Sequence, residues 1–170
     1  ITGGANNDSL TGGAGNDTFN IDSGTDIITD LTTGDIVVIS NGASLNVTGI
    51  TGFVATNASS NANASATSAN LTAASGTVTI DMSDSTGKYT ITGGSGDNTL
   101  KAGKQDSVVK GESGDDIIVG DAGADTLTGG AGNDTFTGNA GNDTFNIDSG
   151  TDIINDLSLI HISEPTRPLY

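Results

Sequence analysis

Aspartate recurs every nine residues in two parts of the chain, each time in a glycine-rich context. Carboxylate side chains and the backbone carbonyls of glycine turns offer only hard oxygen ligands, which suit Ca²⁺. The chemistry that this pattern predicts is the binding of calcium ions. The predicted metal ligands are Asp8, Asp17, Asp26, Asp35, Asp116, Asp125, Asp134, Asp143 and Asp152.

The clearest run is five consecutive nonapeptides from Gly111 to Asn155, which read GESGDDIIV, GDAGADTLT, GGAGNDTFT, GNAGNDTFN and IDSGTDIIN. In each unit the fourth residue is Gly, the sixth is Asp and the eighth is Ile, Leu or Phe. Glycines at positions one, two and four predict tight turns with φ > 0. The residues after the Asp alternate out, in, out, as in a short strand. One unit therefore makes a turn and a strand, and two units make one coil.

In such a coil the Asp of one unit lies over the Asp two units later, about 4.8 Å away. Stacked carboxylates repel one another unless a cation lies between them. The spacing thus predicts cations between the stacked carboxylates of successive coils. The expected rows are Asp116–Asp134–Asp152 and Asp125–Asp143 in one part of the chain, and Asp8–Asp26 and Asp17–Asp35 in the other.

The unit resembles the RTX nonapeptide repeat, G-G-x-G-x-D-x-U-x. The resemblance implies a right-handed parallel β-roll with Ca²⁺ held between successive turns on both edges. It also implies export through a bacterial type I secretion channel. The expected fold class is all-β, with two β-roll blocks joined by an uncharged β-rich or flexible insert.

Four segments follow from the repeat pattern. Residues 1–38 form a first block, GGANNDSLT, GGAGNDTFN, IDSGTDIIT and DLTTGDIVV, whose last unit has lost its early glycines. Residues 39–92 are rich in Ala, Ser, Asn and Thr, and no charged residue lies between Ile36 and Ile80. This composition allows a flexible linker, or a metal-free β-solenoid or β insert in which Asn and Thr form side-chain ladders. Residues 93–156 form the second block.

The second block opens with two atypical units, GGSGDNTLK and AGKQDSVVK. Position six holds Asn98 and then Ser107, and three lysines lie nearby. One interpretation is a transition segment in which metal binding is weakened and lysine neutralises carboxylates. The other is an ordinary solvated surface.

The two ends of the sequence carry separate expectations. Ile1 is not a start residue, so we expect a piece of a longer protein. The ending LSLIHISEPTR resembles the translation of a transposon-type sequencing adapter. We therefore interpret residues 157–170 as an adapter artefact and leave them out of the fold prediction.

Composition argues against several other functions. The chain has 21 acidic residues and 5 Lys and Arg, so its net charge is −16. This charge disfavours nucleic acid and anionic membranes as partners. The chain has no Cys, and its single histidine, His161, lies in the suspect ending, so no disulfide, zinc site or histidine triad can be built. No apolar run approaches a membrane span, and no phosphate-binding loop occurs. We expect a protein that is not an enzyme.

One apolar residue in nine gives a thin core, so we expect a chain that is disordered without Ca²⁺ and folds when the ion binds. The expected location is extracellular or on the cell surface, in a surface-layer or adhesin-like protein. The alternative is a secretion and folding module of an exported hydrolase or toxin. Cell-surface polysaccharide or self-assembly are further partner hypotheses, and outward Thr rows (Thr18, Thr126, Thr135, Thr144) could meet a sugar or ice surface.

Overall fold

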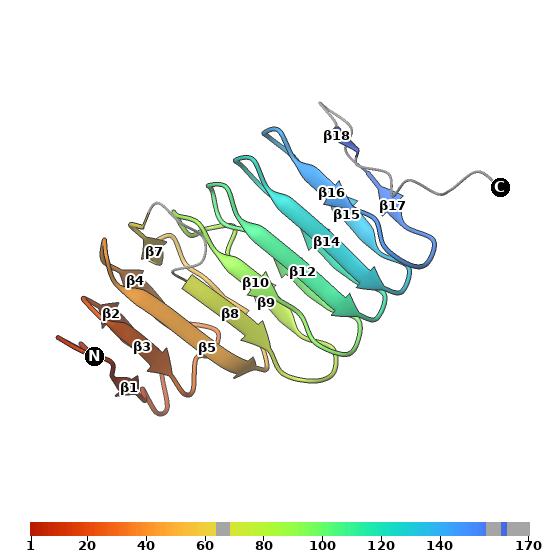
Figure 1. Ribbon diagram of the computed structural model, residues 1–170. Coiled ribbons are helices and arrows are strands. Elements are labelled where there is room, and N and C mark those ends of the chain that lie inside the picture. Colours follow the sequence, from red (N-terminus) through yellow and green to blue (C-terminus); the bar gives the residue numbers. More distant parts are fainter. Residues whose placement is uncertain (64–68, 156–160, 163–170) are drawn as a thin grey trace.

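The computed structural model describes residues 1–63, 69–155 and 161–162. All its regular elements are β-strands, and all their pairings are parallel. The strands stack as a β-solenoid of about 8 turns, which runs from β1 at one end to β17 at the other (Figure 1). The expected all-β parallel β-roll is confirmed. Among the described residues, no helix has the length and apolar character needed to cross a membrane.

One face of the solenoid is a single nine-stranded sheet that runs its whole length (Figure 1). Its strands are, in spatial order, β1 (Ser9–Leu10), β3 (Thr25–Ile28), β5 (Ser44–Ile50), β8 (Ala69–Ala73), β10 (Thr90–Thr92), β12 (Val108–Ser113), β14 (Thr126–Ala131), β16 (Thr144–Asn146) and β18 (His161–Ile162).

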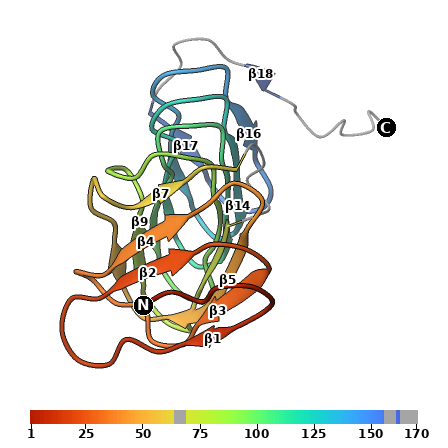
Figure 2. The same ribbon diagram turned by 90° about the vertical axis from the view of Figure 1, so that its left-hand side faces the viewer.

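The remaining strands form two further sheets. The three-stranded one lies toward the N-terminal end, where β2 and β4 face the viewer in Figure 2. It contains β2 (Thr18–Ile21), β4 (Ile36–Ile39) and β7 (Ser60–Asn61). The six-stranded one contains β6 (Phe53–Val54), β9 (Thr79–Asp81), β11 (Thr99–Lys101), β13 (Ile117–Val119), β15 (Thr135–Thr137) and β17 (Ile153–Ile154).

Register in the repeat blocks follows the two-unit coil. Thr126 pairs with Thr144 on the nine-stranded sheet, and Thr135 pairs with Ile153 on the six-stranded sheet, both 18 residues apart. Position eight points inward: Ile118, Leu127 and Phe136 are fully buried, whereas Ile117 at position seven is 49% exposed. The out, in, out alternation predicted for each unit is present.

The turns depart from the prediction at position one. Position-four glycines, such as Gly114 and Gly132, have positive φ, and so do position-two residues, including Glu112 and Asn139. Position-one glycines such as Gly129 do not. The expectation that position one needs glycine for a left-handed turn was therefore wrong, and the reason for glycine there lies in the aspartate sites.

Residues 39–92 carry strands β5 to β10 and continue the stack between the two blocks. Residues 64–68, part of the Ala/Ser/Asn/Thr-rich stretch, lie outside the described residues. The central coils are longer than the repeat coils: Asn46 pairs with Asn70, 24 residues later. The two amide side chains hydrogen-bond at 2.7 Å, so an asparagine ladder forms here between neighbouring coils.

Core content also differs along the stack. From Leu31 to Val109, both included, the described residues hold twenty buried apolar side chains, among them Phe53, Met82 and Tyr89. From Gly111 onward the described residues hold four, all at position eight. The thin core predicted from the repeat applies to the blocks but was wrong for the centre, where longer coils enclose larger side chains.

Candidate calcium sites

Seven of the nine position-six aspartates hold their carboxylate against the preceding coil. Oδ1 of Asp134 accepts a hydrogen bond from the backbone N–H of Asp116 at 2.8 Å, and Oδ1 of Asp143 accepts one from Asp125 at 2.9 Å. The first block repeats this contact between Asp26 and the N–H of Asp8. The predicted rows are thus brought together on both edges, because every coil places its turn directly over the turn 18 residues away.

The same contact recurs along the rows. The other carboxylates that accept such an N–H are Asp35 from Asp17, Asp116 from Asn98, Asp125 from Ser107 and Asp152 from Asp134. All nine predicted ligands therefore take part in contacts between a side chain and the backbone of a neighbouring coil. These contacts form four separate rows.

The second carboxylate oxygen of several of these residues has no partner. It is buried and accepts no hydrogen bond in Asp8, Asp26, Asp116, Asp125 and Asp134. A buried carboxylate oxygen without a partner costs free energy on the order of several kcal/mol, so native structures rarely tolerate one without a cation nearby. These five oxygens point to positively charged ligands that bind at the turns.

In the second block the unpartnered oxygen lies beside the position-one glycine of its own unit. A Cβ added to Gly120 would lie 2.7 Å from Oδ2 of Asp125 and 2.8 Å from the carbonyl oxygen of Gly138. Gly111 has the same relation to Oδ2 of Asp116 and the Gly129 carbonyl. Position one is glycine because a side chain there would fill the space in which a carboxylate and a carbonyl oxygen converge.

In the first block two carboxylates converge on one glycine. A Cβ at Gly3 would lie 2.6 Å from Oδ2 of Asp26 and 3.5 Å from Oδ2 of Asp8, and both oxygens are unpartnered. Like charges at such a distance repel strongly unless a cation intervenes. This edge of the first block has the donor chemistry of a calcium site.

The opposite edge of the first block is built differently. Oδ2 of Asp35 accepts the backbone N–H of Thr32 at 2.9 Å and its hydroxyl at 3.3 Å, so both Asp35 oxygens have partners. Asp17, on the same edge, is only partly buried. Of the predicted ligands, Asp35 is the one whose oxygens are satisfied by protein groups alone.

The donor set fits calcium better than a transition metal. Among the described residues, no three His, Cys, Asp or Glu side chains cluster as a metal site. The available ligands are instead one or two carboxylate oxygens with backbone carbonyl oxygens, a hard oxygen set typical of Ca²⁺. The carbonyls of Gly129 and Gly138 were not predicted individually, because a backbone ligand leaves no residue type to recognise.

Burial changes the acidity of these groups. It raises the pKa of Asp125 to about 7, an effect opposed by the Ser107 N–H and increased by the nearby Asp143 carboxylate. Burial likewise raises the pKa of Asp116 and of Asp134. Without a cation, the folded sites disfavour the ionised carboxylates that calcium requires.

A second ladder, not predicted from the sequence, runs through position five. Oδ1 of Asp115 accepts the N–H of Asn133 at 2.7 Å, and Oδ1 of Asn133 accepts the N–H of Thr151 at 2.8 Å. These side chains bond to the following coil, whereas position six bonds to the preceding one. The recurring Asn or Asp at position five was the available signal, and its role is to join neighbouring turns.

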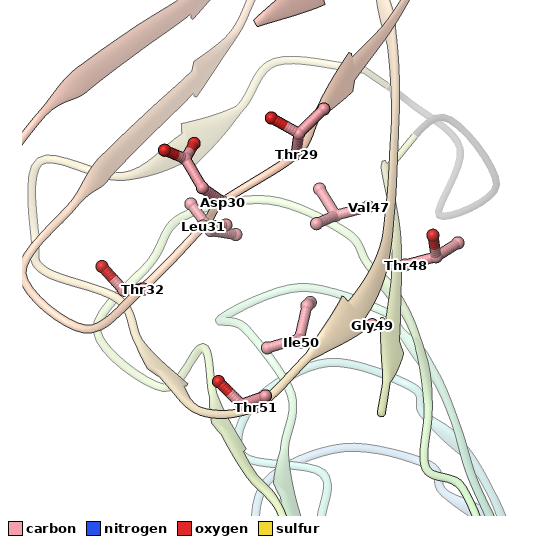
Figure 3. A pocket seen from close by; sticks show the side chains of 9 residues that line it. All are labelled: Thr29, Asp30, Leu31, Thr32, Val47, Thr48, Gly49, Ile50 and Thr51. Carbon is pink, nitrogen blue, oxygen red and sulfur yellow. The ribbon is translucent and has the colours of Figure 1, made fainter. Parts of the chain in front are cut away.

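A hollow of about 180 Å³ lies where the first block meets the longer coils (Figure 3). It is lined by Thr29, Asp30, Leu31, Thr32, Val47, Thr48, Gly49, Ile50 and Thr51. The register of β5 shifts between Val47 and Ile50, and Gly49 has positive φ, which indicates a β-bulge at this wall.

The Asp30 carboxylate beside this hollow already has partners. It accepts the backbone N–H groups of Gly12 at 3.0 Å and Gly13 at 2.8 Å, which hold the pKa of Asp30 below its usual value. Asp30 therefore caps the turn of the preceding coil.

A family model of the RTX calcium-binding nonapeptide repeat (4 copies) matches residues 1–28, 92–127 and 119–154. Comparisons with curated proteins and with solved structures gave no match. The matched segments contain all five aspartates with an unpartnered oxygen and leave out residues 29–91. Because they cover more than half of the sequence and coincide with the glycine-cradled aspartates, the chain belongs to the RTX calcium-binding nonapeptide repeat family.

Proposed function

We propose that this β-roll belongs to an exported bacterial protein, and that calcium outside the cell completes its folding. The observation that carries the proposal is the set of buried, unpartnered aspartate oxygens beside position-one glycines. Such sites are unfavourable without a cation and favourable with one, so calcium binding contributes directly to folding.

The export step follows from the difference in calcium concentration across the cell envelope. Site affinities of roughly 10⁻⁴ to 10⁻³ M, as in extracellular modules, would leave the sites empty in the cytosol and filled outside. We propose passage through a type I channel before calcium orders the repeat blocks. Incomplete folding in the cytosol supports that route, as does membership of a family whose proteins are typically secreted.

We propose a surface-layer or adhesin-like protein as the host. The uncharged central segment continues the solenoid between two calcium-binding blocks, which suits an extended structural array. A secretion module of an exported hydrolase or toxin is the other candidate. Flanking sequence separates them: further repeats favour the first, and a catalytic motif favours the second.

Isothermal titration calorimetry of the full chain with CaCl₂ tests the binding sites. We expect calcium to bind with a large heat of coupled folding, and Mg²⁺ to give little heat. The Asp134→Ala, Asp143→Ala double variant should lose part of the binding. The charge-matched Asp22→Ala, Asp84→Ala double variant should keep it, because both side chains are exposed and lie outside position six. Equal binding by the two variants would contradict the assignment.

A further inference from the structure

We propose that the coils between Asp30 and Ser107 form a calcium-independent core, and that calcium orders only the blocks on either side of it. The proposal deepens the function proposed above and rests on it for the identity of the ion. It is carried by hydrogen bonding, charge pairing and core content, which all change at the same two boundaries.

The first observation is that neutral residues take the aspartate positions in the central coils. Asn98 at position six keeps the ladder contact, because its Oδ1 accepts the N–H of Val78 at 3.0 Å. Its Nδ2 donates to the carbonyl of Gly96, an oxygen in its own turn. Both polar atoms of the Asn98 amide thus have hydrogen-bond partners, whereas the second carboxylate oxygen of Asp116 has none.

Ser107 makes the same substitution with a shorter side chain. Its hydroxyl accepts the N–H of Tyr89 at 3.2 Å and donates to the Gln105 carbonyl at 2.8 Å. The position-one residue of this unit is Ala102, which is fully buried. In this unit, which has no carboxylate at position six, position one is alanine rather than glycine.

In the longer coils, too, buried polar side chains hydrogen-bond to neighbouring side chains or to the backbone. Nδ2 of Asn63 donates to the Ala43 carbonyl and to Oδ1 of Asn61, both at 2.9 Å. Nδ2 of Asn61 donates to the Lys88 carbonyl at 2.6 Å. The hydroxyl of Ser85 donates to the Ser59 carbonyl at 2.8 Å. Among the described residues, every buried side-chain oxygen without a partner lies outside this network, in Asp8, Asp26, Asp116, Asp125 or Asp134.

Two carboxylates of the central coils are paired with lysine, and a third, Asp84, is exposed to solvent. Asp81 lies 2.7 Å from Lys101, and Asp106 lies 2.9 Å from Lys88. At the N-terminal boundary, Asp30 and Asp35 accept backbone N–H groups with both oxygens. This part of the structure therefore has little unbalanced charge for calcium to neutralise.

Apolar burial supplies the stability that calcium supplies elsewhere. The twenty buried apolar side chains between Leu31 and Val109 include the largest ones of the central coils, Phe53, Met82 and Tyr89. Removing these large apolar side chains from water stabilises the folded central coils. The repeat blocks have one such side chain per nonapeptide, so they depend on the ion and on docking against the core.

Hydrogen exchange of the full chain, followed by mass spectrometry in chelator and in CaCl₂, tests the proposal. In chelator we expect peptides between Ser44 and Val109 to exchange at least about tenfold more slowly than those from the two blocks. Calcium should then slow exchange in residues 1–28 and 111–155. Uniformly fast exchange in chelator would contradict a calcium-independent core, even if calcium protects the whole chain. Failure of calcium to protect the blocks would instead contradict the proposed function.

A matched pair of variants moves the boundary by one coil. Asn98→Asp places a carboxylate beside Gly93 and the Gly111 carbonyl, so its coil should lose protection in chelator and regain it with calcium. Asp116→Asn, the next position in the same row, should gain protection in chelator and bind less calcium. If neither variant changes protection in chelator, the side chain at position six does not determine calcium dependence and the proposal is wrong.

Discussion

The central coils and the repeat blocks build the same parallel sheets from different chemistry. Between Leu31 and Val109 the coils are longer, enclose large apolar side chains and satisfy their polar groups with amides and hydroxyls. After Gly111 the coils keep to 18 residues, bury one apolar side chain per unit and hold carboxylate oxygens without a partner. The contrast indicates that a solenoid coil can be stabilised by its own core or by an ion between turns.

The two edges of the first block show the contrast on a smaller scale. Asp8 and Asp26 direct unpartnered oxygens toward Gly3, whereas Asp35 on the other edge is satisfied by Thr32. A single nearby turn is therefore enough to convert a site that needs a cation into one that does not.

The largest effect that separates the two regions should come from a position-one glycine. Gly129→Ala places a methyl group against Oδ2 of Asp134 and 2.9 Å from the Phe136 ring, so we expect a loss of about 1–3 kcal/mol and of the local calcium site. Thermal unfolding in CaCl₂ measures it. Gly52→Ala in the central coils is the control: its φ is not positive and its nearest neighbour would lie 3.9 Å away. Equal destabilisation by both variants would show that the aspartate site does not require glycine at position 129.

A second comparison concerns the pH dependence of the apo protein. The pKa of Asp125 is about 7 in the fold against 3.8 as its ordinary value, so the folded state binds the extra proton between those pH values. In chelator, the stability that this protonation gives the second block should therefore be greatest below pH 3.8 and be lost as the pH rises toward 7. Calcium affinity should change in the opposite direction, because protons compete for the same oxygens.

Hydrogen exchange of residues 111–155 across this pH range, corrected for intrinsic rates, gives the measurement. Asp125→Asn should make the stability of the second block in chelator less dependent on pH. The central coils should not share the trend, since the pKa of Asp81 is lowered: burial would raise it, but Lys101 and Ser83 together outweigh that effect. A second block that becomes more stable as the pH rises in chelator would contradict the account.

A third comparison uses the two edges of the first block. Asp26→Asn should remove calcium binding from this block, because the site at Gly3 loses one of its two carboxylates. Asp35→Asn should leave calcium binding unchanged, because both Asp35 oxygens already have protein partners. Calorimetric stoichiometry measures both, and a loss of calcium with Asp35→Asn would place a metal site on that edge after all.

The smallest effect should come from the central ion pairs. Lys101→Met breaks the contact with Asp81 at a partly exposed site, so we expect a cost of up to about 1 kcal/mol, reduced by salt. Chemical denaturation in chelator at low and high salt measures it. A cost of several kcal/mol would mean that charge pairing, rather than apolar burial, stabilises the centre.

The sequence was most informative where the chain is periodic. The nine-residue interval predicted coils of two units, the inward position-eight residues such as Phe136 and the stacking of Asp116 over Asp134. These features repeat, so one correct unit predicts them all. The resemblance to the RTX repeat implied the parallel β-roll. The route of Oδ1 to the preceding coil and the carbonyls of Gly129 and Gly138 were not predictable, because they depend on backbone placement across coils.

The central coils were ambiguous for a related reason. Their length changes from 18 to 24 residues, so Asn46 and Asn70 share no visible period. Their buried Ser, Asn and Ala residues resemble a low-complexity linker in composition. Only the pairing of β5 with β8 shows that these side chains face a shared core.

Far-UV circular dichroism of the full chain during a Ca²⁺ titration, with Mg²⁺ as control, tests the central claim most directly. We expect a partial β signal in chelator from the central coils and a cooperative, calcium-specific increase as the blocks fold. A complete β spectrum in chelator that calcium leaves unchanged would contradict it, because the unpartnered aspartate oxygens would then need no cation.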